Sequence, residues 1–207
     1  MDVFSVSNSA PRVESTGTST RIATAVRRAE ELRNSRISGT SVNLLGFMDA
    51  SARGHSQWFG MPHFEAEKEL FNSVKRELSK LIQADDRLFF PLGIGQHLDH
   101  LLVSRIGISY LLDNHKRIFF YEDLPYASRW PRQYGYINLG EPRGLSRTLL
   151  PIDFVAKLEL CRTYKSQFRI YTPLRIVAYS KMLRHDGKSY ERVWNVNNPK
   201  ILGGLAN

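Results

Sequence analysis

The chain has little cysteine, no long apolar run and no recognisable leader. Cys161 is the single cysteine among 207 residues, which excludes an internal disulfide and a metal site built from cysteines. No segment approaches the roughly 18 consecutive apolar residues that a membrane-spanning helix requires. Residues 1–5 lack a basic region followed by an apolar one, so they are unlike a secretory signal. Together these features favour the cytosol.

The chain also lacks a concentrated block of charge. Its 29 Lys and Arg against 20 Asp and Glu give a net charge of +9, but the basic residues are scattered in small groups. A solvated basic surface accounts for this pattern, so nucleic acid is not the favoured partner. A basic module that binds nucleic acid or another anion stays open as an alternative.

The apolar periodicity predicts alternating strands and helices within one domain. The expected strands span 3–6, 41–47, 87–91 and 117–121, and the expected helices span 21–36, 64–82 and 101–112. This alternation is typical of a parallel sheet with covering helices, an α/β fold. Residues 122–148 are expected to be mostly irregular. Two further helices are expected over 152–168 and 175–183, followed by a loosely ordered tail over 184–207.

Two histidines and an aspartate follow the predicted strand 87–91, in the segment His97-Leu98-Asp99-His100. Ligands bind at the carboxyl ends of strands in open α/β sheets. His97 and His100 are three residues apart and would share one face of a helix, and neutral imidazole is a common zinc ligand. Asp99 could orient a neighbouring imidazole. The alternative is that Asp99 only caps the helix and the histidines are incidental.

Several segments, in this order and spacing, resemble the PIG-L / LmbE-like de-N-acetylases, zinc-dependent enzymes that remove an acetyl group from N-acetylglucosamine-type substrates. The resemblance runs from about Val3 to about Gln167. The segments that carry it are Arg27-Arg28-Ala29-Glu30, Leu45-Gly46-Phe47-Met48-Asp49, His97-Leu98-Asp99-His100-Leu101-Leu102-Val103, Tyr121-Glu122-Asp123-Leu124-Pro125-Tyr126 and Tyr164-Lys165-Ser166-Gln167.

The resemblance implies a Rossmann-like, mostly parallel sheet flanked by helices, forming a single domain over 1–183. It implies that His100 is a zinc ligand, that His97 donates a proton or stabilises the oxyanion, and that Asp99 tunes His97. Arg27 and Asp49 match polar residues that help to hold the sugar. The implied reaction is attack of a zinc-bound water on the acetamide, the metal lowering the pKa of that water to about 7.

The chain departs from the family at its first motif, His-Pro-Asp-Asp-Glu, which supplies two metal ligands and the general base. No His-Pro pair occurs here, and the single Asp-Asp pair, Asp85-Asp86, precedes a strand instead of following one. The resemblance therefore implies that the first strand–loop–helix unit is missing. His55, His63 and Asp123 are candidates to replace the missing ligands, because a catalytic zinc usually has three protein ligands.

Three hypotheses follow for the function. The chain is a truncated or wrongly started product of an active zinc-dependent N-deacetylase, a glycan-binding relative without catalysis, or the basic anion-binding module described above. Arg27 and Glu30 are equally consistent with an exposed helical pair, and Asp49 with an ordinary loop residue. The sequence indicates neither the particular sugar nor an oligomeric state.

Overall fold

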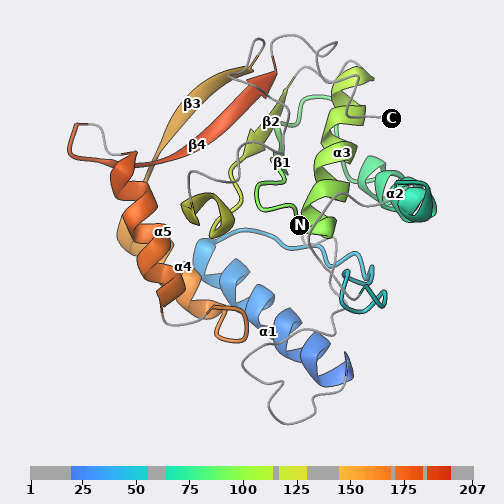
Figure 1. Ribbon diagram of the computed structural model, residues 1–207, viewed down its shortest axis with the longest axis horizontal. Helices are drawn as coiled ribbons and strands as arrows, with labels where there is room; N and C mark the ends of the chain where they lie inside the picture. Colours follow the sequence, from blue (N-terminus) through green and yellow to red (C-terminus); the bar gives the residue numbers. More distant parts are fainter. Residues whose placement is uncertain are drawn as a thin grey trace. The chain divides into compact units, whose positions relative to one another are not determined.

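The computed structural model describes residues 20–55, 64–113, 117–129, 145–168, 171–183 and 186–196 (Figure 1). The chain forms two compact units, Met1–Trp58 with Ile152–Ala178, and Phe59–Pro151 with Tyr179–Asn207. Each unit is described by itself. Among the helices of the described ranges, none combines the length and apolarity needed to cross a membrane.

The first unit is built on α1 (Thr20–Ser38) and α4 (Phe154–Thr163), which pack against each other. The Asn34 amide of α1 donates to the Leu160 carbonyl at 3.2 Å and to Thr163 Oγ1 at 3.0 Å on α4. Asp153 begins α4 as its N-cap, accepting from the backbone N–H of Val155 and Ala156. Most of α5 (Tyr171–Met182) also belongs to this unit.

The second unit holds a four-stranded sheet in the order β1-β2-β4-β3. Its strands are β1 (Leu88–Pro91), β2 (Ile118–Tyr121), β3 (Leu145–Ile152) and β4 (Ser189–Val196). β1 and β2 pair in parallel, joined by the crossover helix α3 (Leu98–Leu112), whereas β2 and β4 pair antiparallel. The α/β fold class is therefore confirmed. Its mostly parallel character and its missing first unit stay predictions.

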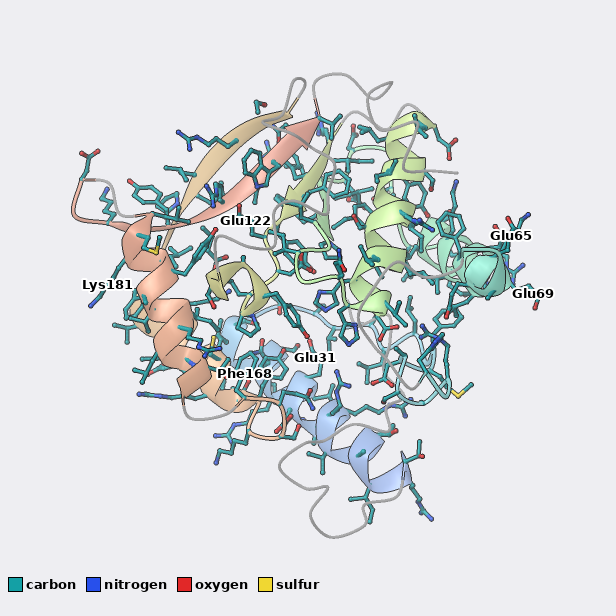
Figure 2. All side chains as sticks on the ribbon, in the orientation of Figure 1. Glu31, Glu65, Glu69, Glu122, Phe168 and Lys181 are labelled. Carbon is teal, nitrogen blue, oxygen red and sulfur yellow. The ribbon has the colours of Figure 1, made fainter. Side chains whose placement is uncertain are left out.

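Helix α3 packs on β1 and β2, beside which it runs in Figure 1, and on α2 (Phe64–Ser79). α3 is buried around most of its circumference, including Ile106, which is fully buried. α2 is amphipathic: Val74 and Leu78 are buried, while Glu65 and Glu69 are exposed and point outward in Figure 2. A helix covered on two sides is expected to be apolar nearly all round, which explains the composition of α3.

Gly107 allows the close approach of α3 to β1. A Cβ at this position would lie 2.6 Å from Phe90 Cγ, inside any normal contact distance. We expect Gly107→Ala to lower the free energy of unfolding by about 1–3 kcal/mol, because overpacking outweighs the gain in helix propensity. Urea unfolding measures this, with Ser109→Ala on the same helix as the control. A stabilised Gly107→Ala variant would contradict the packing.

The helices predicted over 21–36, 64–82 and 101–112 and the strands over 87–91 and 117–121 are confirmed within a few residues at their ends. The strand predicted over 41–47 is wrong, because this segment holds isolated bridges at Leu44 and Met48 and no continuous strand. The strand predicted over 3–6 lies outside the described residues. The loosely ordered tail is wrong for residues 189–196, which form β4 because β2 provides an antiparallel partner. β3 was likewise missed.

Candidate active site

The loop between β1 and α3 bends through backbone conformations that few residues adopt. Gly93, Gly95 and Gln96 have φ of +83°, +87° and +59°, and the Gln96 N–H donates to the Gly93 carbonyl at 3.1 Å. A Cβ at Gly95 would lie 2.7 Å from Tyr126 Cγ, so only glycine fits against that ring. This turn brings His97 to the N-cap position of α3.

Asp123 fastens this loop and the helix that follows it. Its carboxylate is buried, with Oδ2 accepting from the backbone N–H of Gly93 at 2.7 Å and of Ile94 at 2.9 Å. Its other oxygen, Oδ1, lies 2.5 Å from His100 Nδ1. Asp123 follows β2 directly after Glu122, and β1 and β2 are parallel neighbours. Their carboxyl ends therefore share one sheet edge, which places Asp123 beside the β1–α3 loop.

The contact with Asp123 fixes the chemistry of the His100 ring. An ionised carboxylate accepts hydrogen bonds. His100 Nδ1 therefore carries a proton and donates a hydrogen bond to Asp123. Nε2 of His100 then presents its lone pair, the arrangement typical of histidines that bind metals. The His100 side chain is 35% exposed, so an incoming group can reach the ring.

His97, Asp99 and Tyr126 lie next to this pair. The His97 and His100 ring centroids are 5.2 Å apart, and the Tyr126 ring meets His100 edge-on at 5.6 Å. Asp99 is buried, and its Oδ2 lies 3.8 Å from His97 Nδ1, beyond hydrogen-bonding distance. The structure thus brings the three predicted residues together.

The geometry separates the roles of the two carboxylates. Asp123 hydrogen-bonds and orients His100, while the expected role of Asp99 in tuning His97 stays a prediction. Asp99 is not the helix cap, because His97 occupies the N-cap position and Asp99 lies in the first turn. A carboxylate in the first turn is favourable there, since the helix dipole is positive at that end.

Two ionisable groups near the site are perturbed by their surroundings. Partial burial and then the negative charge of Asp123 raise the pKa of Tyr121, whose surface is 41% exposed. Burial lowers the pKa of Arg105, which lies on α3. In both cases burial disfavours the charged form of the group.

A complete metal site is not assembled by the described parts of the chain. Within them, no group of three His, Cys, Asp or Glu side chains is placed to hold a metal ion. His100, oriented by Asp123, fits one ligand position. His55 lies in the described part of the first unit and belongs to no such group, while His63 lies outside the described residues.

In the first unit, Arg27 and Asp49 contact each other. Arg27 Nη1 donates to Asp49 Oδ2 at 2.8 Å, and Asp49 Oδ1 accepts from Ser51 Oγ at 2.6 Å and from the Ala52 N–H at 3.0 Å. Asp49 is buried and closes the turn that follows it, so it is more than an ordinary loop residue. The predicted role of Arg27 and Asp49 in holding a sugar stays a prediction.

Two further segments of the resemblance also meet in this unit. Glu30 of α1 accepts from the Ser166 N–H at 2.7 Å and from Ser166 Oγ at 2.6 Å. Its neighbour Glu31, labelled in Figure 2, accepts from the Tyr164 hydroxyl at 2.7 Å. Glu30 is therefore not an exposed partner of Arg27. These bonds tie down the residues after α4, which is why the helix predicted over 152–168 ends at Thr163.

We expect Glu30→Gln to lower the free energy of unfolding by about 1.5–3 kcal/mol, because one of two charge-assisted hydrogen bonds to Ser166 is lost. Thermal unfolding measures this. Glu159→Gln, on the exposed surface of α4, is the matched control and is expected to change little. Equal effects of the two substitutions would mean that the Glu30–Ser166 contact contributes nothing.

The chain is similar to several deacetylases. It is 31% identical over 128 residues to 2′-N-acetylparomamine deacetylase of Streptomyces fradiae, a match that covers 60% of this chain and 46% of the relative. The chain thus spans about half the length of that curated relative. No protein-family model matches the sequence.

Solved deacetylase structures superpose on most of the chain. The crystal structure of a deacetylase–bog complex from the teicoplanin biosynthesis pathway matches with a TM-score of 0.73 and 19% identity, covering 93% of this chain and 83% of the other. The zinc-inhibited form of a teicoplanin deacetylase matches with a TM-score of 0.72 and 19% identity, covering 93% and 84%. The chain has the fold of these deacetylases.

Sequence reasoning missed a buried polar cluster next to Asp123. Glu122, labelled in Figure 2, has Oε1 2.7 Å from Arg192 Nε and accepts from Trp194 Nε1 at 3.0 Å. Its Oε2 accepts from the Tyr179 hydroxyl of α5 and from Arg192 Nη2. Arg192 and Trp194 belong to β4, in the region expected to be a tail. The alternation of Tyr190, Arg192 and Trp194 was the signal of a strand there.

Proposed function

We propose that the chain removes the N-acetyl group from an acetamido sugar of the N-acetylglucosamine type, with His97, Asp99 and His100 at the reaction centre. The observation that carries the proposal is the His100–Asp123 pair at the carboxyl end of the parallel strands β1 and β2. Two comparisons support the proposal. The chain has the fold of solved deacetylases, and it is 31% identical over 128 residues to a deacetylase whose named substrate is an N-acetylated amino sugar. Arg27 and Asp49 are proposed to contact the sugar.

Zinc is the metal that this proposal expects. The donor set at His100 fits it, since a histidine whose Nδ1–H is bonded to a carboxylate is the usual form of a zinc ligand. One solved deacetylase structure with the same fold is a zinc-inhibited form. His100 would hold the ion through Nε2. When bound, zinc supplies a Lewis acid that polarises the amide and makes water acidic. The described residues supply this one ligand and not a complete set.

The remaining chemistry belongs to side chains of α3 and its preceding loop. Asp123 keeps His100 in one tautomer and one orientation. His97 is the N-cap of α3, at the end where the helix dipole favours negative charge, and is placed to stabilise an oxyanion or to donate a proton to the departing amine. Asp99 lies beside His97, with its Oδ2 3.8 Å from His97 Nδ1.

Acetate release measured by proton NMR tests the proposal. The purified chain with zinc is incubated with an N-acetylated amino sugar, and the acetate signal is followed against His100→Ala and against His55→Ala, a described histidine outside the proposed site. We expect release by the wild type and by His55→Ala, and a loss of at least about 100-fold in His100→Ala. Release that is unaffected by His100→Ala would contradict the proposed site.

The second candidate is a glycan-binding relative without catalysis. One observation favours it, namely that the described residues assemble one oriented metal ligand instead of three. The same experiment separates the two candidates. Binding of the acetamido sugar without any acetate release, in the presence of zinc, would support the binding protein and exclude the enzyme.

A further inference from the structure

Two unfavourable features meet at Gln96. It is one of two residues other than glycine with positive φ in the described ranges, the other being Asp186. Its side-chain nitrogen Nε2 is buried and makes no hydrogen bond within the described part of the chain. Residues other than glycine seldom adopt a left-handed backbone, and native proteins seldom bury a hydrogen-bond donor without an acceptor. Both features cluster at functional sites.

The surrounding loop holds Gln96 in this conformation. Asp123 accepts from the N–H groups of Gly93 and Ile94, and Gly95 packs against the Tyr126 ring. The Gln96 N–H itself closes the turn to the Gly93 carbonyl. Because these contacts fix the residues around it, Gln96 cannot relax without breaking the loop that also positions His97 and His100. The strain is therefore built into the candidate active site.

The carboxamide nitrogen can only donate, so it requires an acceptor oxygen. Turning the Gln96 side chain toward an incoming group breaks no existing bond of that nitrogen. Gln96 immediately precedes His97, so an acceptor that it meets lies close to the group undergoing reaction. We propose that Gln96 donates a hydrogen bond to the carbonyl oxygen of the substrate acetamido group and so selects the acetylated sugar over the free amine. This inference rests on the proposed function.

A role in binding and a purely structural role predict the same change in stability but different affinities for Gln96→Gly. The substitution relieves the backbone strain, so the thermal midpoint is expected to rise by about 2–4 °C in either case. If Gln96 binds the acetyl oxygen, the dissociation constant for methyl N-acetylglucosaminide, measured by NMR titration, should increase about three- to tenfold, the value of one neutral hydrogen bond. Affinity for the corresponding free amine, methyl glucosaminide, should not change.

Gln96→Asn and Asp186→Gly complete the experiment. Asn tolerates positive φ and keeps the donor, so it should recover part of the affinity. Asp186→Gly relieves the same backbone conformation in an exposed turn before β4 and should leave both affinities unchanged. A Gln96→Gly variant with wild-type affinity for the acetylated sugar, or with equal losses for both sugars, would overturn the inference.

The outcomes also separate this inference from the proposed function. If the chain releases acetate but Gln96→Gly does not change the affinity, the proposed function is supported and the role of Gln96 is rejected. Binding that depends on Gln96, without acetate release, rejects the deacetylase and keeps the recognition. A wild-type chain that neither binds nor hydrolyses the acetylated sugar rejects both.

Discussion

Asp123→Asn is expected to lower the affinity of the chain for zinc by about 10- to 100-fold, and deacetylation with it. The reason is that every group around this carboxylate is a donor. The N–H groups of Gly93 and Ile94 share Oδ2, and His100 Nδ1 faces Oδ1. An asparagine has one oxygen and one NH₂ group, so it cannot accept from both sides.

The two backbone donors decide which way the asparagine lies. They cannot rotate away, so the amide oxygen of Asn at position 123 is expected to face them and its NH₂ group to face His100. His100 Nδ1 would then accept, and the ring proton would move to Nε2. That tautomer has no lone pair at Nε2 to offer a metal ion, while the fold around it stays largely intact.

Nitrogen-15 NMR of the histidine rings measures the tautomer directly, and a competition titration measures the zinc affinity. The matched control is Asp113→Asn, at the C-cap of α3, where the carboxylate makes an exposed pair with Lys75 at 2.8 Å. The control is expected to leave both quantities unchanged. A His100 ring protonated at Nδ1 in Asp123→Asn, with wild-type zinc affinity, would contradict the assigned role of Asp123.

Arg192→Met is expected to lower the free energy of unfolding by about 3–5 kcal/mol, because it leaves Glu122 as an uncompensated buried charge. The Glu122 side chain is 2% exposed and the Arg192 side chain 15%. Tyr179 and Trp194 also donate to Glu122, but neither is a cation. The loss should therefore exceed that of any surface ion pair in the chain.

Urea unfolding of a double-mutant cycle tests this expectation. Glu122→Gln combined with Arg192→Met should recover part of the lost stability, since the buried charge is then removed together with its partner. Lys75→Met, which removes the cation of the exposed Lys75–Asp113 pair, is the control and should change stability by about 1 kcal/mol or less. If Arg192→Met destabilises no more than Lys75→Met, the buried pair does not stabilise the sheet.

The sequence predicts best those helices and strands whose pattern of apolar residues matches the faces that they bury. α2 has one apolar face, and the strand–loop–helix from Leu88 through α3 carries continuous apolar residues because it is covered on both sides. β4 has no apolar face of this kind, and its only local signal is the alternation of Tyr190, Arg192 and Trp194. It depends on antiparallel pairing with β2 and on the burial of Arg192 against Glu122, neither of which can be derived from local sequence.

The same limit applies to the candidate site. Histidines three residues apart at a strand–helix junction are visible in sequence, and the structure brings His97 and His100 together as expected. The expected role of Asp99 in tuning the nearby His97 stays a prediction. The partner of His100, Asp123, is 23 residues away, and only the parallel pairing of β1 and β2 brings it there. Its position directly beyond a buried strand was the available signal.

We propose that His100, oriented by Asp123, holds the metal of a sugar deacetylase. Mass spectrometry measures the metal content of the purified chain after loading with zinc, with His100→Ala prepared in parallel. We expect about one zinc per chain in the wild type and its loss in His100→Ala. No bound zinc in the wild type, or equal zinc in both proteins, would contradict it.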